Sequence, residues 1–320
     1  MIFDVITIGS ATRDIFVDAN FLQSKENYSC LVHGQKFEMP QPLIETGGGA
    51  TNTAVGFARL GLKTGIIAKV GNDSAGFTVK HTLHEEGVNT DHIVRDAHTG
   101  TALALIFMKK NVDRTVFVYR GASDDLRERD VQLKMKTKWV YISALGKHAI
   151  RVLKPLLLAA KKKKIQIALN PGAAELQMPE LVKFIDVLIL NREEAEIMAG
   201  AKGESMVLVK KLAEKGAKKV IITDGKNQIF AYDQERIYTV KPYDGKIEST
   251  LGAGDAFASG CITAIMKGLS MEDALKWGCL NAASVIQHIG AKTGLLQEQK
   301  IGFFERSLRQ QCEVVQHGAR

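Results

Sequence analysis

The chain has 320 residues, of which 45% are hydrophobic and 24% charged, so it can bury a substantial core and does not have a disordered composition. Its net charge of +8 comes from dispersed Lys and Arg, and no apolar run is long enough to span a bilayer, so we expect neither nucleic acid nor a membrane as a partner. The N-terminus (MIFDVITIGS) reads as a strand rather than a signal peptide, and the four cysteines are far apart, so we expect a cytoplasmic protein with reduced thiols.

Short apolar, β-branched runs alternate with helical stretches along most of the chain. Strands are expected at Val5–Ile8, Thr64–Val70, Trp139–Ile142, Ile165–Leu169, Val187–Leu190 and Val220–Thr223. Helices are expected between and after them, at Asn52–Leu60, Ala75–Glu86, Ala149–Ala160, Arg192–Ala199, Met206–Lys215 and Ala256–Lys267. The basic run Lys161–Lys164 follows one of these helices, where cations suit the carboxyl end of the helix dipole. The alternation predicts β-α-β units on a mostly parallel sheet that helices cover on both faces.

Two β-rich segments interrupt this alternation. Residues 12–45 contain no convincing helix and have scattered strand-like pieces at Ile15–Val17, Leu31–Val32 and Lys36–Met39. Residues 99–121 predict a hairpin with a polar turn at Asn111–Arg114. Such insertions into an α/β body suggest a lid over an active site, so we expect one domain, 1–320, with lid insertions around 12–45 and 99–121.

The segment from Gly252 to Asp255 (GAGD) runs directly into a helical stretch. Its small residues let backbone N–H groups approach a ligand, and the start of a helix adds the positive end of its dipole, which together suit a phosphoryl group. Asp255, in the first turn, could accept the proton of an attacking hydroxyl. From these residues alone, a Gly-rich turn with Asp as a helix-start residue is an equally good interpretation.

A second glycine-rich segment, TGGGATNTA at Thr46–Ala54, also precedes a helix. A substrate could lie against its backbone, with Asn52 hydrogen-bonding to hydroxyl groups; tight packing of helix on sheet is the alternative. The first strand is not followed by a GxGxxG fingerprint, which argues against a dinucleotide-dependent oxidoreductase. The chain also lacks GxxxxGK[ST], so it is not a P-loop kinase.

Together, GGGATNTA with Gly61 and Gly71, and STLGAGDAFASG some two hundred residues later, resemble the two signatures of the PfkB, or ribokinase-like, carbohydrate kinases. The resemblance covers essentially the whole chain. It implies a three-layer α/β/α fold with a mostly parallel central sheet and a small β-sheet lid, and it implies ATP and Mg²⁺ as cofactors. By this resemblance Asp255 is the catalytic base, and the backbone of Gly252, Ala253 and Gly254 forms the anion hole. The substrate-binding positions that it implies are Asp14, Gly48 and Asn52.

The resemblance also implies a nucleotide site. Asn191 and Glu194 match an NxxE motif, in which Glu194 helps to hold Mg²⁺ through water. By spacing alone a helix capping box is the better interpretation, and the other motifs favour the NxxE motif. Thr223 and Gly225 match the start of a nucleotide loop, TxGxxG, and Asn281 matches a residue beside the adenine.

Four positions depart from the family pattern. Ser249 replaces an Asp that takes part in a monovalent-cation site, so dependence on K⁺ stays open. Gln228 replaces the last Gly of TxGxxG, so that turn must close differently. Thr12 and Gly49 also differ, and substrate identity is therefore not carried over.

We therefore expect an ATP-dependent phosphotransferase that acts on a hydroxyl, primary by preference, of a pentose or hexose. A nucleoside is the alternative substrate, since Phe107, Phe117 and Tyr119 of the hairpin could form a slot for its base. A sugar acid would need a cation, and Arg13, Arg114 and Arg120 are available. The alternative of another class is a non-catalytic sugar- or nucleotide-binding protein. The apolar strands of residues 101–119 would suit a homodimer through the lid, or packing of the lid on its own body.

Overall fold

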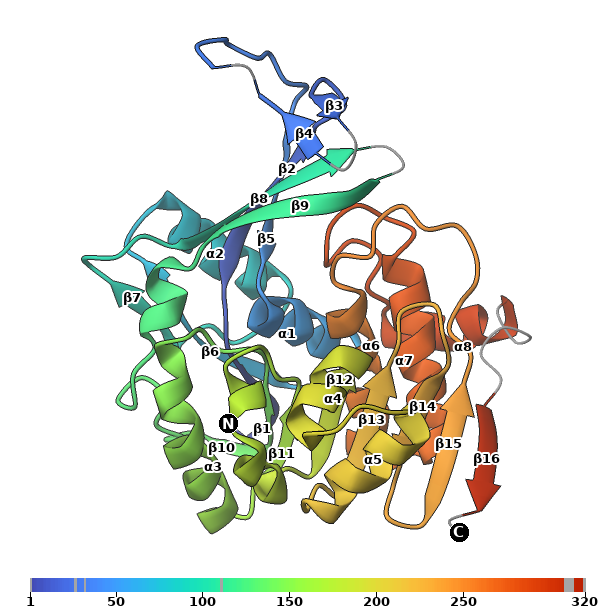
Figure 1. Cartoon of the computed structure of the whole chain (residues 1–320). Helices are drawn as coiled ribbons and strands as arrows, with labels where there is room; N and C mark the ends of the chain where they lie inside the picture. The colour runs from blue at the N-terminus through green and yellow to red at the C-terminus, as the bar shows by residue number, and fades with distance from the viewer. Residues whose placement is uncertain (1, 26–27, 32, 110–111, 308–313, 319–320) are drawn as a thin grey trace.

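The computed structural model describes residues 2–25, 28–31, 33–109, 112–307 and 314–318. Its centre is a ten-stranded sheet in the order β16-β15-β14-β13-β12-β11-β10-β1-β6-β7 (Figure 1). The strands from β7 to β13 in this order are parallel, and β14, β15 and β16 are added antiparallel. The strands are β1 (Ile2–Ile8), β6 (Thr64–Gly71), β7 (Ile93–Asp96), β10 (Lys136–Ile142), β11 (Gln166–Leu169), β12 (Val187–Asn191), β13 (Lys219–Thr223), β14 (Ile229–Tyr232), β15 (Arg236–Val240) and β16 (Val314–Gly318).

Helices cover both faces of this sheet. They are α1 (Gly49–Arg59), α2 (Ser74–Glu85), α3 (Leu153–Lys162), α4 (Arg192–Ala199), α5 (Ser205–Glu214), α6 (Ala253–Met266), α7 (Met271–Val285) and α8 (Glu298–Ser307), with short 3₁₀ turns η1 (Gly121–Asp125), η2 (Ala149–Val152), η3 (Glu175–Gln177) and η4 (Pro179–Phe184). Alternate residues of each strand enter different cores: Leu188 and Leu190 pack with α3, α4 and α5, whereas Val187 and Ile189 pack with α6 and α7. The predicted three-layer α/β/α arrangement is therefore confirmed.

A second sheet stands over one edge of the body, and we call it the lid sheet. Its order is β5-β2-β8-β9, from β2 (Thr12–Asp18), β5 (Leu43–Gly47), β8 (Ala102–Lys109) and β9 (Val112–Tyr119). The small hairpin of β3 (Gln23–Lys25) and β4 (Tyr28–Cys30) lies beyond it (Figure 1). The strands come from the two β-rich segments that interrupt the alternation in the sequence.

Four details of the lid differ from the prediction. Lys36–Met39 forms no strand: the segment is exposed on all sides, so its alternating pattern has no core to face. Leu31 also lies outside any strand, and Val32 is outside the described residues. The hairpin turn was placed too late, since residues 112–114 already belong to β9 and residues 110–111 are outside the described residues. The strand β5 was missed.

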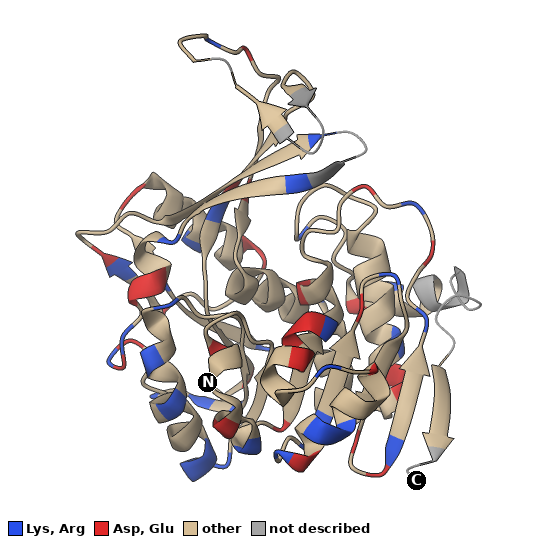
Figure 2. Cartoon of the chain, viewed as in Figure 1, with Lys and Arg blue, Asp and Glu red and all other residues tan. Residues whose placement is uncertain are grey.

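The body matches the sequence more closely. The predicted helix at residues 149–160 begins as the 3₁₀ turn η2 and continues as α3, and the basic run lies at the end of α3, where Lys161 pairs with Asp186 at 2.8 Å. Basic and acidic residues are interspersed along most elements (Figure 2). Within the described ranges, no helix has both the length and the apolar character that crossing a membrane requires.

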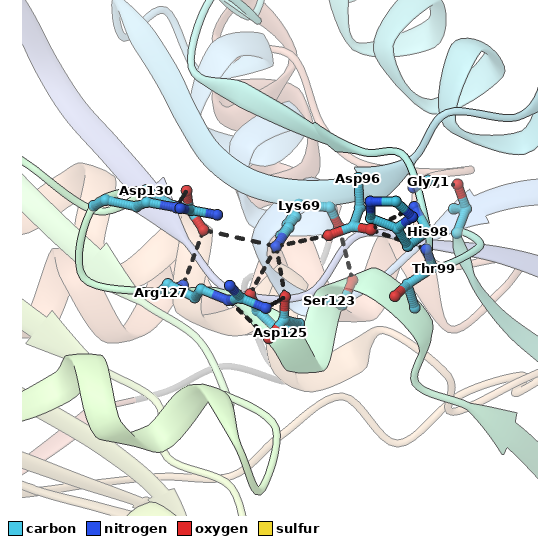
Figure 3. A network of polar contacts seen from close by, with 11 residues as sticks. Lys69, Gly71, Asp96, His98, Thr99, Ser123, Asp125, Arg127 and Asp130 are labelled. Carbon is cyan, nitrogen blue, oxygen red and sulfur yellow. Dashed lines mark hydrogen bonds and ion pairs between the residues drawn. The ribbon is translucent and has the colours of Figure 1, made fainter.

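A buried lysine ties the base of the lid sheet to the body (Figure 3). Lys69 of β6 is 3% exposed, and its Nζ lies 2.9 Å from Asp96 and 2.7 Å from Asp125. Burial opposes the charge, but these hydrogen bonds raise the pKa of Lys69 above its usual value. In the same turn, η1, Ser123 donates to the carbonyl of Ala11 at 2.9 Å. The network therefore fixes the point at which the chain returns from the lid to the body.

Candidate active site

Two helices that start far apart in the sequence meet at the carboxyl end of the parallel strands. The Nδ2 of Asn52, on α1, donates to the Oδ2 of Asp255, on α6, at 2.8 Å, although 203 residues separate them. Ser10, which follows β1, holds the start of α1 because its Oγ accepts from the N–H of Gly49 at 3.2 Å. The two glycine-rich segments of the sequence thus form one site.

The segment GAGD forms the start of α6. Gly252 is the N-terminal cap in a left-handed conformation (φ 80°), and a Cβ there would lie 2.6 Å from the Cα of Ala291. Among the described residues, the N–H of Ala253 reaches the carbonyl of Thr250 at 3.3 Å, while those of Gly254 and Asp255 have no acceptor. Unpaired N–H groups at the positive end of a fourteen-residue helix can bind an anion.

The carboxyl group of Asp255 lies beside these N–H groups. Burial raises its pKa to about 6, and the nearby charge of Asp14 acts in the same direction. The hydrogen bond from Asn52 and the charge of Lys292 oppose this shift. An Asp with such a pKa can accept a proton near neutral pH, as a general base must.

Gly48 is a second position that only glycine can fill. Its φ is 93°, and a Cβ would lie 2.5 Å from the carbonyl oxygen of Ser10. This close approach allows the loop after β1 and the start of α1 to pack together. The structure therefore gives Gly48 and the buried Asn52 roles inside the site, and neither lines the cavity described next.

A cavity of about 210 Å³ lies between the body and the lid sheet. Asp14 is buried in its wall, and Thr12 donates to its Oδ1 at 2.6 Å. Burial raises the pKa of Asp14, while the Thr12 hydrogen bond and Lys292 lower it. The other lining residues are Ser10, Ala102, Ala104, Ile106, Val116, Val118, Arg120, Ser123, Asp124, Gly146 and Leu251. The lid wall of the cavity is therefore aliphatic where β8 and β9 form it and polar where β2 contributes Thr12 and Asp14, and the cavity reaches Leu251, the residue before the GAGD segment.

The lid aromatics do not form the slot that a nucleoside base would need. Val116 and Val118 face the cavity, so the alternation of β9 turns Phe117 and Tyr119 to the opposite face, where they are 61% and 53% exposed. Phe107 packs edge-on against Phe117, with ring centroids 5.5 Å apart.

Asn191 and Glu194 form a capping box at the start of α4. The Oδ1 of Asn191 accepts from the N–H of Glu194 at 2.8 Å, and the Oε2 of Glu194 accepts from the N–H of Asn191 at 2.9 Å. Burial raises the pKa of Glu194, and the second carboxylate oxygen has no hydrogen-bond donor among the described residues. That oxygen could accept a hydrogen bond from a water molecule bound to Mg²⁺. Within the described residues, no three His, Cys, Asp or Glu side chains lie close enough to hold an ion by themselves.

Thr223 ends the neighbouring strand, β13, and Gly225 lies in the turn after it. Thr223 is the partner of Asn191 in the register of β12 and β13, so both residues lie at the same edge of the sheet. Gly225 is left-handed (φ 54°), and the turn closes with the N–H of Asn227 on the carbonyl of Asp224 at 2.8 Å. The turn therefore closes before Gln228, as the missing last glycine required.

Asn281 does not reach the site surface. It is fully buried in α7: its Nδ2 donates to the carbonyl of Ala256 at 2.8 Å and to the Oγ of Ser259 at 3.2 Å, and its Oδ1 accepts from the N–H of Leu296 at 2.9 Å. These bonds use all of its hydrogen-bonding groups, so its side chain anchors α7 to α6 rather than facing a nucleotide.

Two cations at the site were not predicted in their roles. Lys292, in the turn after α7, donates to the Oδ1 of Asn52 at 2.7 Å and to the carbonyl of Thr46. Arg114 of the lid donates to the Oγ1 of Thr250 at 2.7 Å, which links the lid to the loop before GAGD. No local sequence motif indicates these roles, because each contact joins segments more than a hundred residues apart.

Comparison with known proteins shows the family and the fold of the chain. Residues 4–298 match the model of the pfkB family carbohydrate kinases. The chain is 29% identical to a ribokinase of Haemophilus influenzae, over 82% of this chain and 89% of that one, and 30% identical to a 5-dehydro-2-deoxygluconokinase of Clostridium perfringens, over 75% and 78%. A structure of Arabidopsis thaliana ribokinase complexed with ribose and ATP has the same fold, with a TM-score of 0.81 at 21% identity over 95% of this chain and 99% of that one.

These relatives are sugar kinases, which favours an enzyme over the alternative of a non-catalytic binding protein. The chain therefore belongs to the pfkB family of carbohydrate kinases and is an enzyme of that class.

Proposed function

We propose that this kinase transfers the γ-phosphoryl group of ATP to a primary hydroxyl of a small sugar, with Asp255 as the general base. The observation that carries the proposal is the position of Asp255: its carboxyl group, with a pKa of about 6, lies at the start of α6 beside N–H groups that have no partner among the described residues. The substrate oxygen attacks the γ-phosphorus, its proton passes to Asp255, and ADP leaves. The N–H groups of Gly252, Ala253 and Gly254 form the anion hole that stabilises charge on the phosphoryl oxygens, and the N–H of Ala253 would exchange its 3.3 Å contact with the carbonyl of Thr250 for the anion.

The nucleotide lies along the carboxyl ends of β12 and β13 in this proposal. Asn191 and Thr223 are register partners at that edge, and Glu194 and Gly225 follow them within three residues. Glu194 would hold Mg²⁺ through water, and the ion would neutralise phosphate charge. The adenine contact proposed from the sequence for Asn281 would have to come from another residue.

The sugar occupies the cavity beneath the lid sheet. Asp14 would accept hydrogen bonds from sugar hydroxyls, and the aliphatic lid wall would exclude water, which competes as the phosphoryl acceptor. Gly48 and Asn52 do not line this cavity. Gly48 allows the loop after β1 to pack on the start of α1, and Asn52 holds the carboxyl group of Asp255. We further propose that the chain acts as one domain, with the lid sheet closing over the bound sugar.

A sugar acid is the second candidate substrate, because of Arg120. This side chain lines the cavity, and within the described residues it forms no ion pair, so it could bind a carboxylate. By their names, the two relatives act on one substrate of each kind, ribose and 5-dehydro-2-deoxygluconate. A nucleoside is supported less, since the lid aromatics face away from the cavity.

The lid sheet could also carry a homodimer contact. Phe117 and Tyr119 are exposed on its outer face, and the strand register places the exposed Ile44 of β5 on the same face. We propose that these apolar side chains pack against the lid sheet of a second copy of the chain. Light scattering of the purified protein measures its molar mass and would distinguish a dimer from a monomer.

The experiment that tests the proposed function is ADP release with Mg-ATP across pentoses, hexoses, sugar acids and nucleosides, with neutral and acidic sugars in matched pairs. We expect one neutral sugar to be preferred. A preference for the acidic member of a pair, lost on Arg120→Gln, would favour the second candidate, and turnover only with nucleosides would contradict the proposal.

A further inference from the structure

Lys292 is a buried lysine in the middle of the site, and the roles assigned above do not use it. It is 7% exposed and lies in the turn between α7 and α8. Its ammonium group donates to the Oδ1 of Asn52 at 2.7 Å and to the carbonyl of Thr46. Within the described part of the chain it forms no ion pair, so a buried charge is held by neutral acceptors alone, which requires a reason.

The first consequence is the orientation of Asn52. An ammonium group has only donors, so the oxygen of the Asn52 amide must face Lys292 and its NH₂ must face Asp255. The NH₂ group then donates to the Oδ2 of Asp255 at 2.8 Å. The other oxygen, Oδ1, has no donor among the described residues and is left to receive the substrate proton. Lys292, Asn52 and Asp255 thus form a chain that fixes which oxygen of the base is free.

The second consequence is electrostatic. The groups whose charges act on Lys292 come from four elements around it: Asp14 of β2, Glu45 of β5, Glu86 after α2 and Asp255 of α6. A second cavity, separate from the one beneath the lid sheet, is lined by Lys292 together with Arg13 and Arg59, and Arg59 donates to the carbonyl oxygen of Lys292 at 3.0 Å. Burial lowers the pKa of Lys292 to about 8, so the side chain is mostly charged at neutral pH. That positive charge lowers the pKa of Asp255, against burial and against Asp14.

We propose that Lys292 is a positioning residue for phosphoryl transfer: it orients Asn52 on Asp255 and supplies the positive charge that keeps this base ionised. Lys292 contacts neither the sugar cavity nor the start of α6, so it acts through Asn52 and through its charge. This inference rests on the proposed role of Asp255 and adds a residue that the role requires in this chain.

The test is the pH dependence of kcat/KM for the wild type and two variants, with Asp255→Asn measured alongside. Lys292→Met removes the donor and the charge at similar volume, while Lys292→Gln keeps a donor for Asn52 and removes only the charge. We expect the acid limb, near pH 6 in the wild type, to move upward by roughly one pH unit in both variants. We also expect the plateau to fall by roughly 10- to 100-fold in Lys292→Met and by less in Lys292→Gln.

The matched control is Lys218→Met, which removes an ion pair to Asp186 of 2.7 Å at the other end of the parallel strands. This variant should keep the wild-type position of the acid limb and the wild-type plateau value of kcat/KM. Lys292→Gln decides the question if Lys292→Met does not fold. An acid limb at the wild-type position in a folded Lys292 variant would overturn the inference, because a merely structural residue would lower activity equally at every pH. Wild-type turnover in Asp255→Asn would instead show that Asp255 is not the base, and this result would contradict the proposed function.

Discussion

Gly252, the left-handed glycine at the start of α6, allows a prediction about the stability of the anion-binding segment that does not depend on the catalytic mechanism. Gly252→Ala places a side chain at φ 80°, and its Cβ would lie 2.6 Å from the Cα of Ala291. The left-handed conformation costs roughly 1–2 kcal/mol for a non-glycine residue, and the overpacking adds roughly 1–3 kcal/mol. We expect a total of roughly 2–5 kcal/mol, which corresponds to a fall in Tm of about 4–15 °C for a chain of this size.

The matched control is Gly254→Ala, two residues further on. A Cβ at Gly254 meets no atom within 4 Å, and its φ is ordinary, so the variant should melt at the wild-type temperature or slightly above. Thermal unfolding followed by calorimetry measures both variants, and coupled ADP release measures their activity. A Gly252→Ala protein that melts within about 1 °C of the wild type would refute the reasoning from backbone strain.

Four further predictions concern the lid, the network at its base, the pH dependence and the cation dependence. Arg114→Met removes the hydrogen bond to Thr250 and should raise KM several-fold with an unchanged Tm; an unchanged KM in steady-state kinetics would contradict a role in closure. Lys69→Met leaves the partly buried carboxylates of Asp96 and Asp125 without their cation and should lower Tm by several degrees in a melting experiment. Wild-type kcat/KM should fall as the pH drops below about 6, because Asp255 is then protonated and cannot accept a proton; a profile flat to pH 5 would argue against this base. Activity should be equal in Na⁺ and K⁺ salts, since Ser249 offers no carboxylate and instead accepts from the N–H of Leu251 at 3.2 Å; strong stimulation by K⁺ would contradict this.

Patterns within short segments were sufficient to predict much of the fold and the centre of the site. The alternation of β-branched runs with helical stretches gave the parallel strands, because burial on both faces requires continuous apolar residues. The glycines of GAGD predicted a turn into a helix, and the structure has a left-handed cap at Gly252 with Asp255 in the first turn. The NxxE spacing predicted a capping box, which Asn191 and Glu194 form.

The features that sequence reasoning missed depend on contacts between distant segments. Lys292 is an ordinary lysine in a polar turn, and only the fold brings it to Asn52 of α1. Phe117 and Tyr119 lie on an alternating strand, but which set of side chains faces the cavity depends on how the lid sheet sits on the body. Asn281 resembled a nucleotide contact because its position in a late helix is visible in the sequence, whereas its burial against α6 is not.

The most direct test of the central claim is the turnover of Asp255→Asn with the preferred sugar at saturating Mg-ATP. The substitution keeps the size of the side chain and removes the proton acceptor, so we expect kcat to fall by on the order of 10²–10⁴, with the Tm and the ATP affinity close to those of the wild type. Near-native turnover in the folded variant would show that Asp255 is not the base, and the proposed mechanism would then be wrong.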